Sequence, residues 1–549
     1  MPAWTLIVPL AVLAAGALLS SLLSARPKAG RAAAAMAVWV AAAVLLGTWL
    51  ATRAPIVAPP SAFDTGAGVR LVLRLDALTA VLGLYLLVSV ALLLTLVRVP
   101  SPALALLATA ASLLTISAGG LLLAALGWGL ALTLIRLMLG QAGAPLSPLS
   151  RLRNELAWLL ILAAGADVAG RAATEQFGDI PVSAVGVATF AAVSAGAAMG
   201  SGLVPWQPWT ASLWRRASPE LGAIAAAVIL PLGFELLLRL YQAGGGRYPG
   251  SFGNLALATL GALVTVGAVL RAQAATSRAA LLSELLPASA GFALLGVGLG
   301  TPLGMACGVA ALGESVLVGV LAPILRRSSS RAQAVGLLAA AALPPSLGFA
   351  LRLLVLQAAL EAGEVYGFLA LLAAAAWIIQ LAATARGLRL ADDATATAAR
   401  AARSTAWVVV AGLGLGGALA AALLAYVAVP AAAAIVHFDQ TALTDLPSAV
   451  ESAAGRWPAF GLGFLIALAA LAVVAATPRW QSPSRLAPQP LIRPLWNVVA
   501  ERAMASLDVL EVPSEFRVTG WVAFDRGLTA ATIWPWVAAT VLLALIAGR

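Results

Sequence analysis

The chain has 549 residues, of which 62 % are hydrophobic and 10 % charged, and its formal net charge is +11. Apolar stretches of roughly 20 residues, enough to cross a hydrocarbon core of about 30 Å, recur from end to end and exclude an ordinary soluble domain. The single cysteine, Cys307, excludes an internal disulfide. Because the chain has only this cysteine and one histidine, His437, a metal site is disfavoured, and we expect no cofactor.

The apolar stretches predict an all-α polytopic membrane protein with about sixteen transmembrane helices. In chain order the predicted spans are 4–23, 32–52, 77–98, 102–119, 120–139, 155–172, 182–205, 216–240, 252–272, 279–300, 302–325, 332–356, 365–386, 404–429, 457–476 and 527–547.

Basic residues predict the orientation of these spans. Arg26, Lys28 and Arg31 follow the first span and none precedes it, which predicts a retained span with the N-terminus outside. Later loops on the inner side hold most of the arginines, whereas the outer loop with Glu361 and Glu364 has none. The positive charge is therefore a topology signal and does not indicate nucleic acid. We expect a multi-pass protein of the inner (cytoplasmic) membrane, embedded in the lipid bilayer.

Two central spans are predicted to be broken. The first break runs from Gly200 to Pro205, and the second contains the paired prolines Pro344 and Pro345. Proline inside a helix removes a backbone donor and clashes with the preceding turn. An ordinary proline kink would explain either break alone. Two breaks at comparable places favour two repeats with an ion path at the unwound segments.

Charges inside the predicted spans are candidate ion-path or charge-network residues, because charge in lipid is costly. Asp167 and Arg171, and likewise Glu235 and Arg239, are four residues apart and can pair on one helix face. A structural ion pair is the favoured interpretation of both, and a proton relay is the alternative.

Further candidates lie in the later spans. Glu314 lies in mid-span without a partner on its own helix, whereas Glu284 lies nearer the inner face, where we expect it to be hydrated. Arg278 begins the tenth span, and Arg352 follows the Pro344-Pro345 break. An unpaired buried charge is costly, so we expect Arg352 to point inward and to pair with a carboxylate or with the carbonyls freed by the break, Glu314 being the favoured partner.

The segment from Leu343 to Arg352 resembles the twelfth-helix motif of the antiporter-like subunits of respiratory complex I, Mrp antiporters and membrane-bound hydrogenases. That motif reads Pro-Pro, then Gly-Phe, then a lysine. The segments Arg74 to Thr79, Ser277 to Leu282, and Val204 to Trp209 are similar to other family motifs. The resemblance covers roughly residues 70 to 390 and implies two inverted five-helix repeats with broken helices.

The chain departs from this family at its ionisable positions. The family's fifth-helix glutamate falls on Gly129, and its seventh-helix lysine falls on Gly200 or Ser201. Its eighth-helix histidine falls near Ala227, and its eleventh-helix histidine and lysine fall near Glu314 and Val318. Its twelfth-helix lysine falls on Arg352. A buried lysine can lose its proton, whereas arginine stays charged in proteins. Arg352 would therefore be a fixed charge, and the first repeat would have no proton relay.

The resemblance implies the following organisation. We predict N-terminal flanking helices at 1–100, a first repeat at 101–245, a second repeat at 246–390, C-terminal flanking helices at 391–476, an inside connector at 477–526 and a final span at 527–549. Within the connector, Leu495 to Leu510 form an amphipathic stretch that would lie along the membrane or along a neighbouring subunit.

These features predict a non-catalytic membrane-arm subunit of an oxidoreductase complex, of the NADH-quinone oxidoreductase or hydrogenase type. Its proton translocation pathway would be reduced or lost and its role largely structural. The expected partners are other polytopic membrane subunits and a peripheral redox module. A cation/proton antiporter subunit and the membrane partner of an inorganic-carbon uptake system are the alternatives.

Overall fold

The structure is a computed structural model. It describes residues 3–58, 72–144, 146, 148–172, 174, 176–204, 213, 218–250, 252–275, 277–325, 330–388, 410, 412–414 and 416–435. These residues belong to one compact unit, Met1–Leu471. Pro205, the predicted spans 457–476 and 527–547, and the predicted helix at 495–510 lie outside the described residues.

The N-terminal part contains a short helix η1 (Ala3–Leu6), two long helices α1 (Val8–Leu22) and α2 (Pro27–Thr52), a pair of short strands and helix α3 (Ala77–Leu96). The strands β1 (Ile56–Ala58) and β2 (Leu73–Leu75) are antiparallel, with Ile56 opposite Leu75. This small sheet was not predicted. It fixes the chain immediately before α3, where Arg74 and Asp76 lie.

Helices α4 to α9 follow. They are α4 (Pro102–Ile116), α5 (Leu121–Gln141), α6 (Pro148–Ala172), α7 (Val187–Ser201) and α9 (Pro219–Ala243), with a 3-10 turn η3 (Val182–Ala184) before α7. Helix α7 ends where the first break was predicted, and Gly202 has a positive φ of 75° that only glycine adopts readily.

Helices α10 to α15 complete the region that resembles the family. They are α10 (Gly253–Gln273), α11 (Arg278–Gly298), α12 (Pro302–Leu325), α13 (Ser330–Ala340), α14 (Leu347–Glu361) and α15 (Glu364–Gly387). The twelfth predicted span is interrupted at Pro344 and Pro345, as expected. Beyond α15 the structure describes η4 (Gly416–Leu419), α17 (Ala420–Leu423), η5 (Leu424–Ala428) and α18 (Val429–Ala433).

The helices pack in the same order in both halves. In the first half α4 packs on α5, α5 on α6, α6 on α7 and α7 on α9; in the second half α10 packs on α11, α11 on α12, α12 on α14 and α14 on α15. Gly127 on α5 lies against Thr115 of α4, and Gly291 on α11 lies in the same way against Thr265 of α10. This shared packing supports the repeat interpretation, while the predicted domain boundaries stay predictions.

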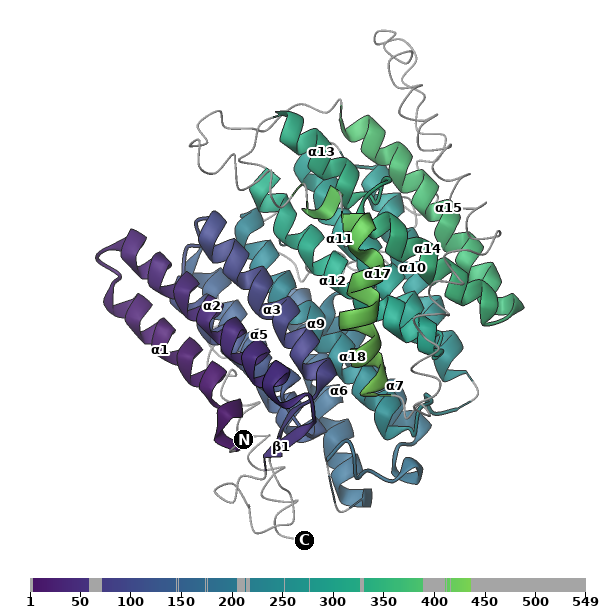
Figure 1. The fold of residues 1–549 in the computed structure, drawn as a ribbon, viewed down its shortest axis with the longest axis horizontal. Helices are drawn as coiled ribbons and strands as arrows, with labels where there is room; N and C mark the ends of the chain where they lie inside the picture. Colours follow the sequence, from purple (N-terminus) through teal and green to yellow (C-terminus); the bar gives the residue numbers. More distant parts are fainter. Residues whose placement is uncertain are drawn as a thin grey trace, which may run out of the picture. The chain divides into compact units, whose positions relative to one another are not determined.

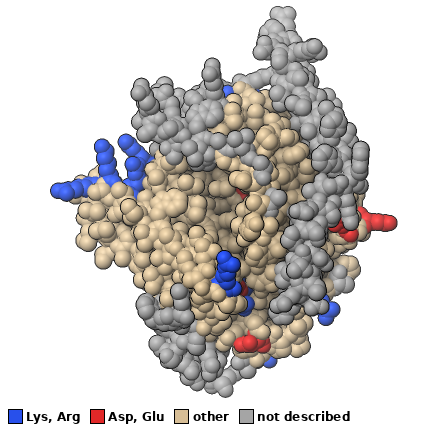
Figure 2. All heavy atoms as spheres, in the orientation of Figure 1, with Lys and Arg blue, Asp and Glu red and all other residues tan. Residues whose placement is uncertain are grey.

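Helix α9 lies at the centre of the bundle, where it contacts α3, α4, α5, α7 and α12 (Figure 1). The apolar window of α9 is entirely buried, whereas only 28 % of the window in the peripheral helix α2 is buried. Eight described helices are long and apolar enough to cross a membrane. Figure 2 shows a face on which charged side chains are sparse. The fold is therefore an all-α membrane protein, and the count of sixteen spans stays a prediction.

Candidate functional site

Two groups of buried polar side chains, one in each half of the helical region, contain most of the buried charged residues described by the structure. The first-half network consists of Arg74, Asp76, Glu235 and Arg239. The second-half cluster consists of Ser289, Glu314, Arg352 and Gln380. The side chains of both groups are almost entirely buried, except that Arg74 remains 14 % exposed.

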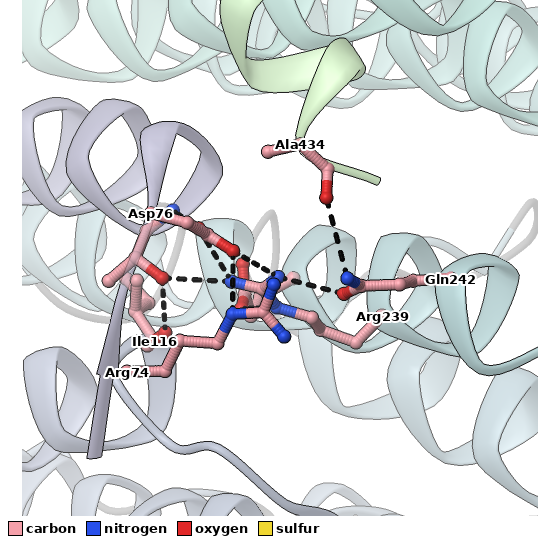
Figure 3. A network of polar contacts seen from close by, with 8 residues as sticks. Arg74, Asp76, Ile116, Arg239, Gln242 and Ala434 are labelled. Atoms are coloured by element: carbon pink, nitrogen blue, oxygen red, sulfur yellow. Dashed lines mark hydrogen bonds and ion pairs between the residues drawn. The ribbon is translucent and has the colours of Figure 1, made fainter. Parts of the chain in front are cut away.

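Arg239 is the centre of the first-half network (Figure 3). Its Nε donates to Oε1 of Glu235 at 2.7 Å, which confirms the predicted pair on α9. It also donates from Nη1 and Nη2 to the two carboxylate oxygens of Asp76, at 2.7 and 2.9 Å. This two-bond arrangement is the strong form of an arginine–carboxylate contact.

Asp76 caps the start of α3 in addition to binding Arg239. It is the N-cap residue of α3, and its Oδ1 accepts a hydrogen bond from the backbone N–H of Thr79 at 2.9 Å. Its Oδ2 lies 2.9 Å from Nε of Arg74. Burial alone would raise the pKa of Asp76. The positive charges of Arg239 and Arg74 lower it by a larger amount, so the pKa of Asp76 lies below its ordinary value. Asp76 is therefore an anion between two cations.

The network reaches the C-terminal helices through Gln242. Arg239 donates from Nη1 to Oε1 of Gln242 at 2.9 Å, and Nε2 of Gln242 donates to the carbonyl of Ala434 at 3.4 Å (Figure 3). Two arginines and two carboxylates balance in charge, and the contacts join three segments distant in sequence. The arrangement is suited to holding helices together.

The partners Arg74 and Asp76 were not predicted as site residues. Asp76 and Arg239 are 163 positions apart, so no helical spacing reveals their contact. The sequence offers one signal, the segment from Arg74 to Thr79, which resembles a family motif and contains both charges.

The second predicted pair is also formed but is closer to the surface. Nε of Arg171 lies 2.9 Å from Oδ1 of Asp167, and Thr189 donates from its hydroxyl to Oδ2 at 2.8 Å. The two charged side chains are 53 % and 36 % exposed, respectively. Exposed pairs contribute little to stability, and this one lies apart from the two buried groups.

Arg352 lies in the interior, as predicted, but its predicted partner was wrong. Its Nη1 donates to the amide oxygen of Gln380 on α15 at 2.8 Å, and no ion pair joins it to Glu314. The guanidinium carbon lies 4.9 Å from the ring centroid of Phe292 and 5.5 Å from that of Trp377. Aromatic faces attract cations and in this way partly replace a counter-ion.

Glu314 contacts Ser289 and the first turn of α14 instead of Arg352. Its Oε2 accepts a hydrogen bond from the hydroxyl of Ser289 on α11. Its Oε1 lies against Gly348 in the first turn of α14, so close that a Cβ at this glycine would be 2.6 Å away. The amino-terminal end of a helix carries partial positive charge that stabilises a carboxylate. Ser289 and Gly348 are thus the neighbours of the Glu314 carboxylate, and no ion pair joins it to Arg352.

Glu284 pairs with an arginine in the last turn of α10, and Arg278 binds the C-terminal end of α15. Glu284 was expected to be hydrated, but its side chain is only 3 % exposed and pairs with Arg271 at 2.8 Å, because α10 and α11 pack tightly there. Arg278 donates to the carbonyl oxygens of Gly387 and Leu388 at 3.2 and 2.7 Å. It therefore satisfies the end of α15.

Indole rings fill the first-half positions where the resembled family has ionisable residues. A Cβ at Gly129 would lie 2.6 Å from Nε1 of Trp158, whose N–H donates to the carbonyl of Ala125. A Cβ at Gly200 would lie 2.6 Å from Cζ2 of Trp128. Ala227 is buried as well. Neither glycine position has room for a lysine or glutamate side chain without displacement of a tryptophan.

Within the described part of the chain, no group of three or more His, Cys, Asp or Glu side chains could hold a metal ion. No protein-family model matches the sequence, and the search of curated proteins found no relative.

Solved structures with a similar fold are subunits of membrane complexes. A chain of the Mrp complex from Dietzia sp. DQ12-45-1b matches 97 % of this chain with a TM-score of 0.69 and 23 % identity, and this chain covers 63 % of its length. A chain of respiratory complex I from Thermus thermophilus matches 77 % of this chain and 99 % of its own length, with a TM-score of 0.60 and 22 % identity.

A chain of the membrane-bound sulfane sulfur reductase, an archaeal respiratory membrane complex, matches 99 % of this chain and all of its own, with a TM-score of 0.64 and 16 % identity. At these identities the likeness concerns the fold. The chain shares its fold with chains of these membrane complexes, in agreement with the resemblance predicted from the sequence.

Proposed function

We propose that this protein is a membrane-arm subunit of a multi-subunit complex related to respiratory complex I, in which its first half serves packing and carries no protons. The supporting observation is the pair of tryptophans, Trp158 and Trp128, that occupy the space beside Gly129 and Gly200. A proton path across a membrane protein needs a succession of ionisable groups or waters, and bulky indoles exclude both.

The charges that remain in the first half suit this structural role. Arg239 is fully engaged by two carboxylates, Thr79 and Gln242, and arginine does not release its proton. The electron-transfer chemistry would belong to a peripheral redox module, and other polytopic subunits would cover part of the membrane surface. The inner (cytoplasmic) membrane is the proposed location.

A subunit of a cation/proton antiporter is the second candidate. The match to the Mrp complex favours it, because it covers 97 % of this chain. The two candidates differ in what the chain does without a redox partner.

Purification of the tagged chain from its native host in mild detergent tests the proposal. We expect recovery together with other polytopic subunits and redox subunits, identified by mass spectrometry. After reconstitution of this chain alone, we expect no sodium- or potassium-driven proton exchange, measured with a pH-sensitive dye. Exchange activity of the lone chain would favour the antiporter subunit instead.

The Ser201→Ala variant of the intact complex tests whether protons pass through the first half. Ser201 carries a buried hydroxyl at the end of α7 beside Gly233. If no proton passes here, the number of protons translocated per electron should be unchanged in the variant. A fall in this ratio at unchanged electron transfer would show that protons do pass through the first half.

A further inference from the structure

Three buried hydrogen-bond donors in the second-half cluster have no partner among the described residues. They are Nε and Nη2 of Arg352 and Nε2 of Gln380, and the two residues are 1 % and 0 % exposed. The two side chains bond each other through the remaining Nη1 and Oε1, at 2.8 Å. A buried donor without a hydrogen-bond partner costs free energy, and the cost is larger for a charged group. Such donors therefore point to a ligand.

The three open atoms of Arg352 and Gln380 are donors, and Arg352 carries a full positive charge, whereas the other open atom of the cluster, Oε1 of Glu314, is an acceptor. The Nε–Nη2 edge of a guanidinium is planar and matches two oxygens of a planar oxyanion, which a lysine ammonium cannot do. We propose that Arg352 and Gln380 form a binding site for a small planar monoanion in the second half of the protein. The site goes beyond the proposed packing role.

Aromatic rings form the walls of this site. Phe292 and Trp377 lie 4.9 and 5.5 Å from the guanidinium carbon of Arg352, and Phe349 packs on Trp377 at 5.5 Å between ring centroids. The indole N–H of Trp377 already donates to the carbonyl of Ala341 at 3.1 Å. The indole N–H is therefore already used, which leaves Arg352 and Gln380 as the donors of the site.

Glu314 is the carboxylate that opposes an anion here. Its Oε1 lies against Gly348, one helical turn before Arg352 on α14, and its Oε2 is held by Ser289. Glu314 therefore acts on the site through its charge without occupying the free edge of Arg352. Removal of that negative charge should strengthen anion binding.

Nitrate is a suitable probe, because it is planar, monovalent and does not titrate near neutral pH. The full-length chain in its native complex, purified in detergent in chloride-free buffer, would be titrated with potassium nitrate by calorimetry. We expect saturable binding to the wild type. Arg352→Gln and Gln380→Glu should abolish it, the second because the new carboxylate would pair with Arg352 from inside the protein.

Glu314→Gln should tighten nitrate binding by about tenfold or more, since one nearby negative charge is removed from a poorly screened site. Arg171→Gln is the matched control, because it removes an arginine from a partly exposed pair, and it should leave nitrate binding unchanged.

Two results would overturn the proposal. One is the absence of saturable binding up to about 100 mM nitrate, which would mean that water satisfies the donors. The other is binding that survives in Gln380→Glu, a variant that keeps the size of the side chain and gives the buried Arg352 a counter-ion, and so should fold even if Arg352→Gln does not. Neither result bears on the first half, since nitrate binding reports neither proton transfer nor subunit association.

Discussion

Two buried arginines, Arg239 and Arg352, differ in how their guanidinium groups are satisfied. Arg239 bonds two carboxylates, a hydroxyl and an amide, and its charge is balanced inside the protein. Arg352 bonds one amide oxygen and lies beside two aromatic rings. Arg239 therefore has all of its donors bonded within the protein, whereas Arg352 has donors without a partner among the described residues.

Asp76→Asn should strongly destabilise the protein. The variant leaves Arg239 and Arg74 buried beside a neutral side chain, and removal of one partner from a buried ion pair costs about 3–5 kcal/mol. Thermal unfolding of the detergent-purified protein, followed by fluorescence, measures the loss. Asp167→Asn, in the exposed pair with Arg171, is the control and should cost about 0–1 kcal/mol. Equal losses in the two variants would contradict the structural role of the network.

Gly129→Ala tests whether indole packing fills the first half. The added methyl would lie 2.6 Å from Nε1 of Trp158, so the tryptophan must shift, at a cost of about 1–3 kcal/mol. Gly170→Ala is the matched control on a neighbouring helix, because a Cβ there meets nothing within 4 Å. A lower unfolding temperature is expected for the first variant only. If Gly129→Ala were as stable as the control, the space beside Trp158 would be open.

At the scale of elements, four of the described helices begin with a side-chain cap. Asp76, Ser218, Ser277 and Ser346 each accept a hydrogen bond from the backbone N–H three residues on, at the starts of α3, α9, α11 and α14. In α14 this cap follows directly on Pro344 and Pro345. The cap therefore lets a new helix start inside the membrane region, where free backbone groups are costly.

The cap of α3 should give the protein a defined dependence on pH. The pKa of Asp76 is lower in the folded protein than its ordinary value, so its ion pairs stabilise the fold fully above the unfolded pKa of about 4. The stabilisation is lost as pH falls through the folded pKa. The difference in unfolding temperature between the wild type and Asp76→Asn should therefore be constant from about pH 8 to pH 5 and shrink only in stronger acid. A difference that shrinks between pH 7 and pH 5 would contradict this assignment.

At the scale of the whole molecule, the two halves meet at α9 and repeat one packing order, yet their interiors differ. The first half is filled by tryptophans at two glycine positions, whereas the second half contains the open donors of Arg352 and Gln380. Both halves therefore contain buried charge, but of the first-half network and the second-half cluster only the network is balanced by ion pairs among the described residues.

The predicted orientation can be tested with single cysteines. Ser24 and Ala54 are exposed at opposite ends of α2, and Cys307 is fully buried. With the N-terminus outside, a membrane-impermeant maleimide should label Ala54→Cys in intact cells and Ser24→Cys only after the membrane is opened. The wild type, with Cys307 alone, is the control for background labelling. The reverse pattern would place the N-terminus inside.

The sequence by itself determined the class of fold and most helix positions. Apolar stretches of membrane-spanning length are a local property, so the predicted spans coincide closely with α1 to α15. Two ion pairs were also predictable, because Asp167 with Arg171 and Glu235 with Arg239 are neighbours on one helix. The break at Pro344 and Pro345 follows from the chemistry of proline.

Only the tertiary structure decided which distant side chains meet. Asp76 pairs with Arg239 because α3 packs on α9, and Gln380 binds Arg352 because α15 packs on α14. The place of Glu314 in the chain favours Arg352 as its partner, but in the structure Glu314 accepts a hydrogen bond from Ser289 and lies against Gly348 in the first turn of α14. A contact between helices depends on their relative rotation and depth, which local sequence patterns do not specify.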